Sequence, residues 1–164
     1  MPIQLDQFDS HSFDRGAPRW KEALWVLVKM LFFLNPFPWP SRLRAVLLRM
    51  FGAKIGCGLV IRSGVNITMP WRFACGDHVW LGEEVLILSL AQVTLGSHVC
   101  VSQRAFLCTG SHDFRKESFD LITKPITVGD HSWIAAMVFV GPGTNIEPNT
   151  MIKAGSVIPN HKAM

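Results

Sequence analysis

The sequence predicts an all-β solenoid of about five coils, preceded by a helical segment. The first observation is a ladder of aliphatic residues spaced six apart: Val128, Ile134, Val140, Ile146, Ile152 and Ile158. A six-residue step equals three strand pleats, so these side chains share one face of short strands, whereas the helical period would scatter them. Three such segments would close one triangular coil of about eighteen residues.

The same register continues upstream and forms the second observation. Three earlier coils have these core positions: Ile55, Ile61 and Ile67; Cys75, Leu81 and Ile87; Leu95, Val101 and Leu107. The steps from Ile67 to Cys75 and from Ile87 to Leu95 are eight residues long, which indicates two-residue extensions at one corner. Glycines at 56, 82, 96, 129 and 141 are expected at corners where a Cβ would clash or φ must be positive. A stack of β-hairpins would instead need Asn-Gly or Asp-Gly turns, and the chain contains neither dipeptide.

The third observation is an interruption of the period. It stops after His112 and resumes at Val128, so residues 113–127 should form a loop extruded from a coil corner. Loops on a rigid scaffold carry function more often than the scaffold does. Of the six histidines, His112 alone stands at the mouth of this loop, and an imidazole can accept and return a proton at neutral pH. We expect His112 to be catalytic; the alternative is a turn-stabilising or solvated histidine.

Residues 1–54 precede the repeats and are predicted to form an arm and two helices. Residues 23–34 are almost wholly apolar, and alternate prolines follow them; Ser41 then resembles the N-cap of a second helix. Twelve residues of helix reach about 18 Å, too short for a bilayer of about 30 Å. Two interpretations remain open: the helices cap the open end of the solenoid, or residues 20–51 lie in a membrane interface with basic side chains on anionic head groups.

Composition limits the other function classes. The 164 residues fit one domain plus its N-terminal segment, and the net charge of +4 comes largely from residues 15–54, which hold eight Lys and Arg against Glu22. We expect no nucleic-acid partner, because no readout motif accompanies the basic residues. The four cysteines match neither a metal site nor a disulfide framework, so we expect free thiols and no metal. The first 19 residues are polar and mixed in charge, which favours a cytoplasmic protein, at the inner face of the plasma membrane if the helices bind lipid.

Several segments resemble the hexapeptide-repeat acyltransferases, and more closely their colanic-acid-type branch, which O-acetylates sugars of exopolysaccharides. These segments are Phe-Gly-Ala-Lys-Ile-Gly at 51–56, Gly-Asp-His-Val-Trp-Leu-Gly-Glu-Glu at 76–84, Thr-Gly-Ser-His-Asp at 109–113, Lys-Pro-Ile at 124–126 and Trp-Ile-Ala-Ala at 133–136. The resemblance covers nearly the whole chain. It implies a left-handed parallel β-helix over residues 55–164 and a homotrimer with an active site in each groove between subunits.

The resemblance also implies a reaction. His112 would act as general base on the hydroxyl of a sugar or lipid-linked saccharide, whose oxygen attacks the thioester of the co-substrate acetyl-CoA directly, in a ternary complex. Ser89, near the corner where relatives carry a polar pair, and Asp113 of the Ser-His-Asp turn would contact this acceptor. The motifs place four residues along the pantetheine arm: Trp133, Ala136, Ala154 and Ser156.

Two other functions stay open on sequence grounds. One is N-acetylation of an amino sugar or an antibiotic by the same fold. The other is a non-catalytic relative, which is favoured by Pro159-Asn160 standing where the family carries a Thr-Lys pair before its tail.

Overall fold

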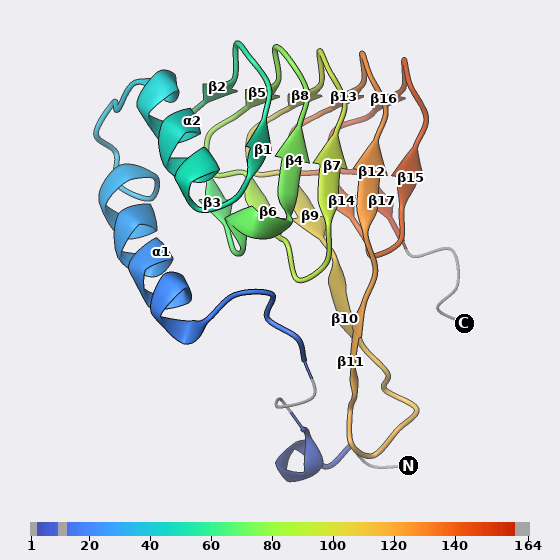
Figure 1. The fold of residues 1–164 in the computed structure, drawn as a ribbon. Helices are drawn as coiled ribbons and strands as arrows, with labels where there is room; N and C mark the ends of the chain where they lie inside the picture. Colours follow the sequence, from blue (N-terminus) through green and yellow to red (C-terminus); the bar gives the residue numbers. More distant parts are fainter. Residues whose placement is uncertain (1–2, 10–12, 160–164) are drawn as a thin grey trace.

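The computed structural model describes residues 3–9 and 13–159 of the chain. A parallel β-solenoid forms the body of the molecule, with two helices at one end and a hairpin that projects from its side (Figure 1). Three five-stranded sheets, here named faces A, B and C, surround a common core. This architecture confirms the predicted solenoid of about five coils with a helical N-terminal segment.

Each coil contributes one strand to every face in the order A, B, C. Face A contains β1 (Lys54–Ile55), β4 (Phe73–Cys75), β7 (Val93–Leu95), β12 (Ile126–Val128) and β15 (Asn145–Ile146). Face B contains β2 (Val60–Ile61), β5 (Trp80–Leu81), β8 (Cys100–Val101), β13 (Trp133–Ile134) and β16 (Met151–Ile152). Face C contains β3 (Asn66–Ile67), β6 (Leu86–Leu88), β9 (Phe106–Cys108), β14 (Phe139–Val140) and β17 (Val157–Ile158). The turns between them are named corners AB, BC and CA.

The predicted aliphatic ladder forms the core, except that Ile55, Ile152 and Ile158 in the end coils are only half-buried. On face B, Ile61 is in register with Leu81, Leu81 with Val101, and Val101 with Ile134, and each of these side chains is at most 1% exposed. A second buried layer comes from the residue two positions earlier in most segments, including Val79, Val85, Val99, Ala105 and Val138. Fully burying one aliphatic side chain stabilises a fold by about 1.5–3 kcal/mol, so the repeated ladder holds the coils together.

Close approach, rather than positive φ, explains the glycines predicted at 56, 82, 96 and 129. A Cβ on Gly129 would lie 2.4 Å from the Pro148 nitrogen in the next coil, so close approach explains this position. Positive φ falls two residues later in the turns, and there non-glycine residues often adopt it: His78, Glu84, His98, Arg104, His131, Met137 and Asn149. Three of these, His78, His98 and His131, are exposed and stack in a column on the solvent side of corner AB.

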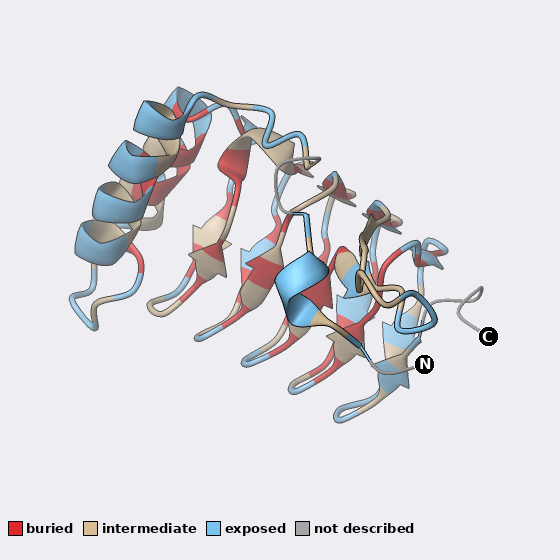
Figure 2. Cartoon of the chain, turned by 90° about the horizontal axis from the view of Figure 1, so that it is seen from below, coloured by how far each residue is buried: buried red, intermediate tan, exposed pale blue. Residues whose placement is uncertain are grey.

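The two helices lie across the first coil. Trp25 of α1 (Arg19–Phe32) is buried and donates its indole N–H to the Ile67 carbonyl at 2.9 Å. Arg44 of α2 (Ser41–Met50) is only 2% exposed and donates to the carbonyls of Ile61, Phe32 and Phe37. Arg44 thus bonds the end of α1 to β2, the edge strand of face B, while the outward side of α1 stays exposed (Figure 2).

The N-cap predicted at Ser41 is wrong, because Pro40 occupies the cap and the Ser41 hydroxyl accepts from the Ile61 amide at 3.0 Å instead. Among the described residues, no helix is both long enough and apolar enough to span a bilayer.

Corner CA carries the additions to the solenoid. After the first coil this corner holds the short helix η2 (Pro70–Arg72). After the third coil it holds the predicted loop, which proves to be a β-hairpin. Its strands are β10 (Gly110–His112) and β11 (Leu121–Thr123), which pair antiparallel. The short N-terminal helix η1 (Leu5–Gln7) lies beside this hairpin (Figure 1), and the Gln4 amide donates to the Glu117 carbonyl at 2.9 Å.

Candidate active site

His112 ends the first strand of the hairpin, and its imidazole has a fixed tautomer. Its Nδ1 lies 2.7 Å from the carbonyl oxygen of Phe119. A carbonyl oxygen can only accept, so Nδ1 carries the proton and Nε2 of the neutral ring keeps its lone pair. The ring is half-buried rather than sealed in the core. A histidine in this state is ready to accept a proton from a hydroxyl group.

Two aromatic rings hold the imidazole in place. The Phe119 ring stacks on it with centroids 4.2 Å apart and an interplanar angle of 2°, and the Phe8 ring meets it edge-on at 5.5 Å. Phe119 has a φ of 49°, a left-handed conformation that costs a residue with a Cβ about 1–2 kcal/mol. This backbone turn brings both the carbonyl and the ring of one residue against His112.

Asp113 follows the histidine and is turned toward the hairpin loop. Its carboxylate accepts from the Arg115 amide at 3.1 Å and from the Arg115 guanidinium at 3.2 Å. These interactions, led by the amide hydrogen bond, lower the pKa of Asp113, so the group is charged at neutral pH. The Asp113 amide donates to the Asp120 carbonyl, and Asp120 pairs with Lys116 at 2.7 Å. Asp113 thus stabilises the loop that carries Phe119, and its predicted contact with substrate stays a prediction.

Ser89 lies at corner CA, one coil before the hairpin. Its side chain is fully buried, and the hydroxyl both accepts from the Met69 amide and donates to the Met69 carbonyl, each at 2.9 Å. A contact between this hydroxyl and a substrate would require the corner to open. The substrate contact of Ser89 stays a prediction, and in the structure its hydroxyl binds the main chain of Met69.

The four residues predicted to contact pantetheine lie elsewhere on the prism. Trp133 is on face B, 48% exposed, with its indole N–H donated to Ser102. Ala136 and Ala154 occupy corner BC in successive coils, joined by the hydrogen bond from the Gly155 amide to the Ala136 carbonyl, and Ser156 follows in the same turn. A pocket of about 260 Å³ opens at this corner, lined by Glu83, Glu84, Gln103, Arg104, Ala136 and Met137. Within one chain, these residues and His112 belong to different corners.

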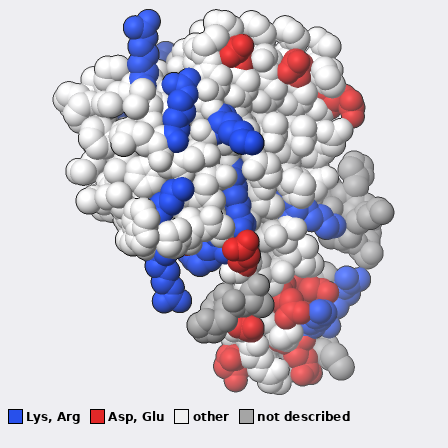
Figure 3. Space-filling view, in the orientation of Figure 1, with Lys and Arg blue, Asp and Glu red and all other residues white. Residues whose placement is uncertain are grey.

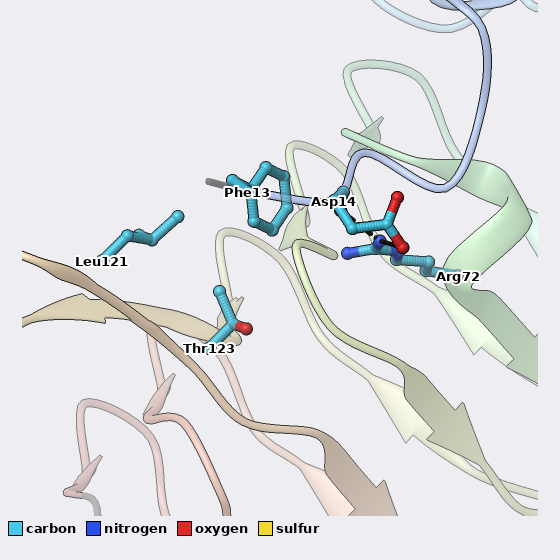
Figure 4. A pocket seen from close by; sticks show the side chains of 5 residues that line it. All are labelled: Phe13, Asp14, Arg72, Leu121 and Thr123. Carbon is cyan, nitrogen blue, oxygen red and sulfur yellow. Dashed lines mark hydrogen bonds and ion pairs between the residues drawn. The ribbon is translucent and has the colours of Figure 1, made fainter. Parts of the chain in front are cut away.

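A second pocket, of about 300 Å³, opens beside the hairpin. Phe13 and Asp14 of the N-terminal arm, Arg72 of η2, and Leu121 and Thr123 of β11 line it (Figure 4). The Arg72 guanidinium lies 5.2 Å from the centre of the Phe13 ring and 3.7 Å from the Asp14 carboxylate. The sequence contains no signal for this pocket, because its walls come from three segments far apart in the chain.

Comparisons with known proteins identify the family. No family model matches the chain. It is 42% identical over 144 residues to WcaF of Escherichia coli, a protein named for an acetyltransferase of colanic acid biosynthesis, and the alignment covers 88% of this chain and 79% of the relative. The chain belongs to the hexapeptide-repeat acyltransferases. This assignment confirms the predicted resemblance.

Solved structures agree with the fold of this acyltransferase. A hexapeptide-repeat acetyltransferase from Vibrio cholerae, complexed with acetyl-CoA, superposes with a TM-score of 0.74 at 23% identity, over 92% of this chain and 81% of the other. A galactoside acetyltransferase in complex with coenzyme A gives the same TM-score at 22% identity, over 90% and 76% of the two chains.

Two site residues of this acyltransferase were not predicted from the sequence. Phe119 lies within the loop, but nothing in the local pattern indicates its left-handed φ or its contact with His112. Phe8 is more than a hundred residues from His112 in the chain, and their contact depends on how the arm folds back. Both contact the His112 ring, and neither side chain can carry a proton.

Proposed function

We propose that this protein is an acetyl-CoA-dependent O-acetyltransferase that acts on a sugar hydroxyl in exopolysaccharide biosynthesis. The observation that carries the proposal is the hydrogen bond from His112 Nδ1 to the Phe119 carbonyl, which leaves Nε2 as a base. The 42% identity with WcaF supports the polymer class, and the likeness to structures solved with acetyl-CoA or coenzyme A supports the acetyl donor.

In the proposed mechanism, His112 Nε2 takes the proton of the acceptor hydroxyl as that oxygen forms a bond with the thioester carbonyl carbon. The Phe119 carbonyl keeps its hydrogen bond to Nδ1–H and so stabilises the imidazolium that forms. Charge that builds on the thioester oxygen needs a fixed donor, such as a backbone N–H beside the groove. The carbon–sulfur bond then breaks, and His112 returns the proton to the sulfur, which leaves as the CoA thiol.

We further propose that the active enzyme is a homotrimer. His112 projects from corner CA, whereas Ala136 and Ala154 line corner BC, so one chain alone separates the base from the groove for the acetyl donor. A neighbouring copy can bring its corner BC to the hairpin of the first. Face B carries exposed Trp80 and Trp133, 57% and 48% exposed, which is the type of surface that subunit contacts cover.

The outward side of α1 supports a further proposal, that the enzyme binds the inner face of the plasma membrane from the cytoplasm. Large apolar side chains recur there at helical spacing and are 45–69% exposed: Trp20, Leu24, Leu27 and Leu31. Exposed basic residues flank them, including Arg19, Arg42, Arg49 and Lys54, and Figure 3 shows Lys and Arg gathered over the side formed by α1 and α2. This composition fits an anionic lipid surface, where lipid-linked saccharides would be met.

Flotation with vesicles tests the membrane contact. We expect wild-type protein to float with phosphatidylglycerol-containing vesicles more than with pure phosphatidylcholine vesicles, and the double variant Leu27→Glu, Leu31→Glu to remain at the bottom. Phe114→Glu is the matched control, because Phe114 is 69% exposed on the hairpin, away from α1. Equal flotation of the double variant and wild type would contradict membrane binding by this face.

His112→Ala tests the catalytic proposal. Loss of a general base lowers kcat by about 10²–10⁴-fold. Product should be measured on sugar acceptors and on amino sugars in parallel, since preferential N-acetylation would favour the alternative activity. Circular dichroism and acetyl-CoA binding should remain those of the wild type. Near-normal turnover by a folded His112→Ala protein would refute the role of His112.

A further inference from the structure

The hairpin has one face that carries both the base and a pocket wall. In the register of the hairpin, His112 is opposite Leu121, and Gly110 is opposite Thr123. Side chains of paired residues point to the same face, and residues two apart along a strand share it. His112, Leu121 and Thr123 therefore lie on one face, with Leu121 about 5 Å from His112 between Cβ atoms.

The N-terminal arm lies against this same face. Phe8 contacts the His112 ring, and the Gln4 amide is bonded to Glu117 in the hairpin loop. Further along the arm, Phe13 and Asp14 face Leu121 and Thr123 across the pocket of about 300 Å³ (Figure 4). The arm thus forms a wall opposite the hairpin, and the pocket lies next to the base along the hairpin.

Arg72 closes the third side and fixes the arm to the solenoid. Its guanidinium donates to the main-chain carbonyls of Leu90 and Asp14, lies over the Phe13 ring, and is only 19% exposed. The Asp14 carboxylate is 90% exposed beside it at 3.7 Å. The pocket therefore offers an apolar ring, a carboxylate that accepts, a guanidinium that donates, and the Thr123 hydroxyl, which does both.

This set of groups matches a neutral saccharide better than an anion. A sugar ring has apolar C–H faces that fit against Phe13 and Leu121, and hydroxyls that both donate to Asp14 and accept from Arg72. A phosphate or carboxylate would instead be placed against the Asp14 carboxylate, which already offsets the charge of Arg72. Charge balance in the pocket thus disfavours an anionic ligand.

We propose that this pocket is an acceptor subsite formed by the N-terminal arm, which binds the neutral sugar unit next to the one that is acetylated. The proposal rests on the proposed O-acetyltransferase function and adds to it that the preferred acceptor contains at least two sugar units. The arm is then part of the acceptor site, with Phe13 and Asp14 as binding residues and Phe8 as a positioning residue for His112.

The test compares acceptors of two lengths. Acetyl transfer by the full chain is measured with methyl glycosides of glucose and galactose and with the corresponding methyl disaccharides, and disaccharide binding is measured by calorimetry. We expect kcat/KM to favour the disaccharides, and Phe13→Ala and Asp14→Asn each to lower this preference by about tenfold. Phe37→Ala, which removes an exposed ring far from the hairpin, is the matched control and should keep the preference.

The outcomes separate the two proposals. Equal use of the two lengths by wild type, or a preference that Phe13→Ala does not change, overturns the subsite while acetyl transfer to sugars still supports the proposed function. Absence of measurable disaccharide binding also overturns the subsite. A preference for phosphorylated over neutral disaccharides would overturn the neutral-ligand assignment. If disaccharides bind at the pocket without acetyl transfer to any sugar, the proposed function fails on its own.

Discussion

Phe119 allows the positioning of His112, the proposed base, to be tested without a change to His112 itself. Its ring stacks on His112, and its backbone adopts a φ of 49°. Two substitutions separate these properties. Phe119→Ala removes the ring and keeps the strained conformation, whereas Phe119→Gly removes the ring and relieves the strain. The carbonyl that accepts from Nδ1 remains in both variants.

The two variants should differ in the stability of the hairpin but not in activity. Phe119→Gly relieves left-handed strain of about 1–2 kcal/mol. The greater unfolded-state entropy of glycine, about 0.5–1 kcal/mol, offsets part of this gain in stability. The hairpin amides of the glycine variant should therefore exchange about two- to fivefold more slowly than those of the alanine variant. Loss of a ring pair worth about 0.5–1.5 kcal/mol should lower kcat/KM by about two- to tenfold in both.

The assay combines product quantification by chromatography with hydrogen exchange of the amides in β10 and β11. Wild-type kcat/KM in both variants would refute the idea that the Phe119 ring positions His112. A loss of activity in Phe119→Ala alone would show that backbone strain, and not the ring, is what matters.

Two further predictions concern stability. Arg44→Met should lower the free energy of unfolding by about 2–4 kcal/mol, because buried carbonyls of α1 and β2 lose a charged donor. The shift of the urea midpoint measures this loss, and an unchanged midpoint would contradict the role of Arg44 in joining the helices to the solenoid. The Arg115 amide lowers the pKa of Asp113, and Lys116 lowers the pKa of Asp120. The two carboxylates should therefore stabilise the hairpin above their ordinary pKa of about 3.9 and lose this effect as the pH falls through the lower folded values. Hairpin chemical shifts that stay native well below this range would count against these contacts.

The solenoid was predictable because its signal is local and repeated. Each coil reports the same six-residue register, so single exceptions such as Cys75 do not obscure the pattern, and the break after His112 locates the hairpin. The internal structure of that hairpin was not predictable, since residues 113–127 have no alternating pattern that indicates β11.

The surroundings of His112 could not be predicted from the sequence either. Phe8 and Arg72 reach the hairpin through folding of the arm and of corner CA, and no local pattern encodes either approach. Ser89 was predicted as a substrate contact from its place at a corner. In the structure its hydroxyl bonds to Met69, and this depends on a main-chain position twenty residues away, which the local sequence does not indicate.

The central claim is that each active site joins the base of one subunit to the donor groove of its neighbour. It can be tested by mixing His112→Ala with Ala136→Trp, a change that should fill the groove at corner BC. Each variant alone should be inactive. Co-expressed in equal amounts, they should recover about a quarter of wild-type activity, because half of the bases and half of the grooves are intact and random assembly pairs them independently. Mixed trimers that remain as inactive as either parent would contradict the shared site.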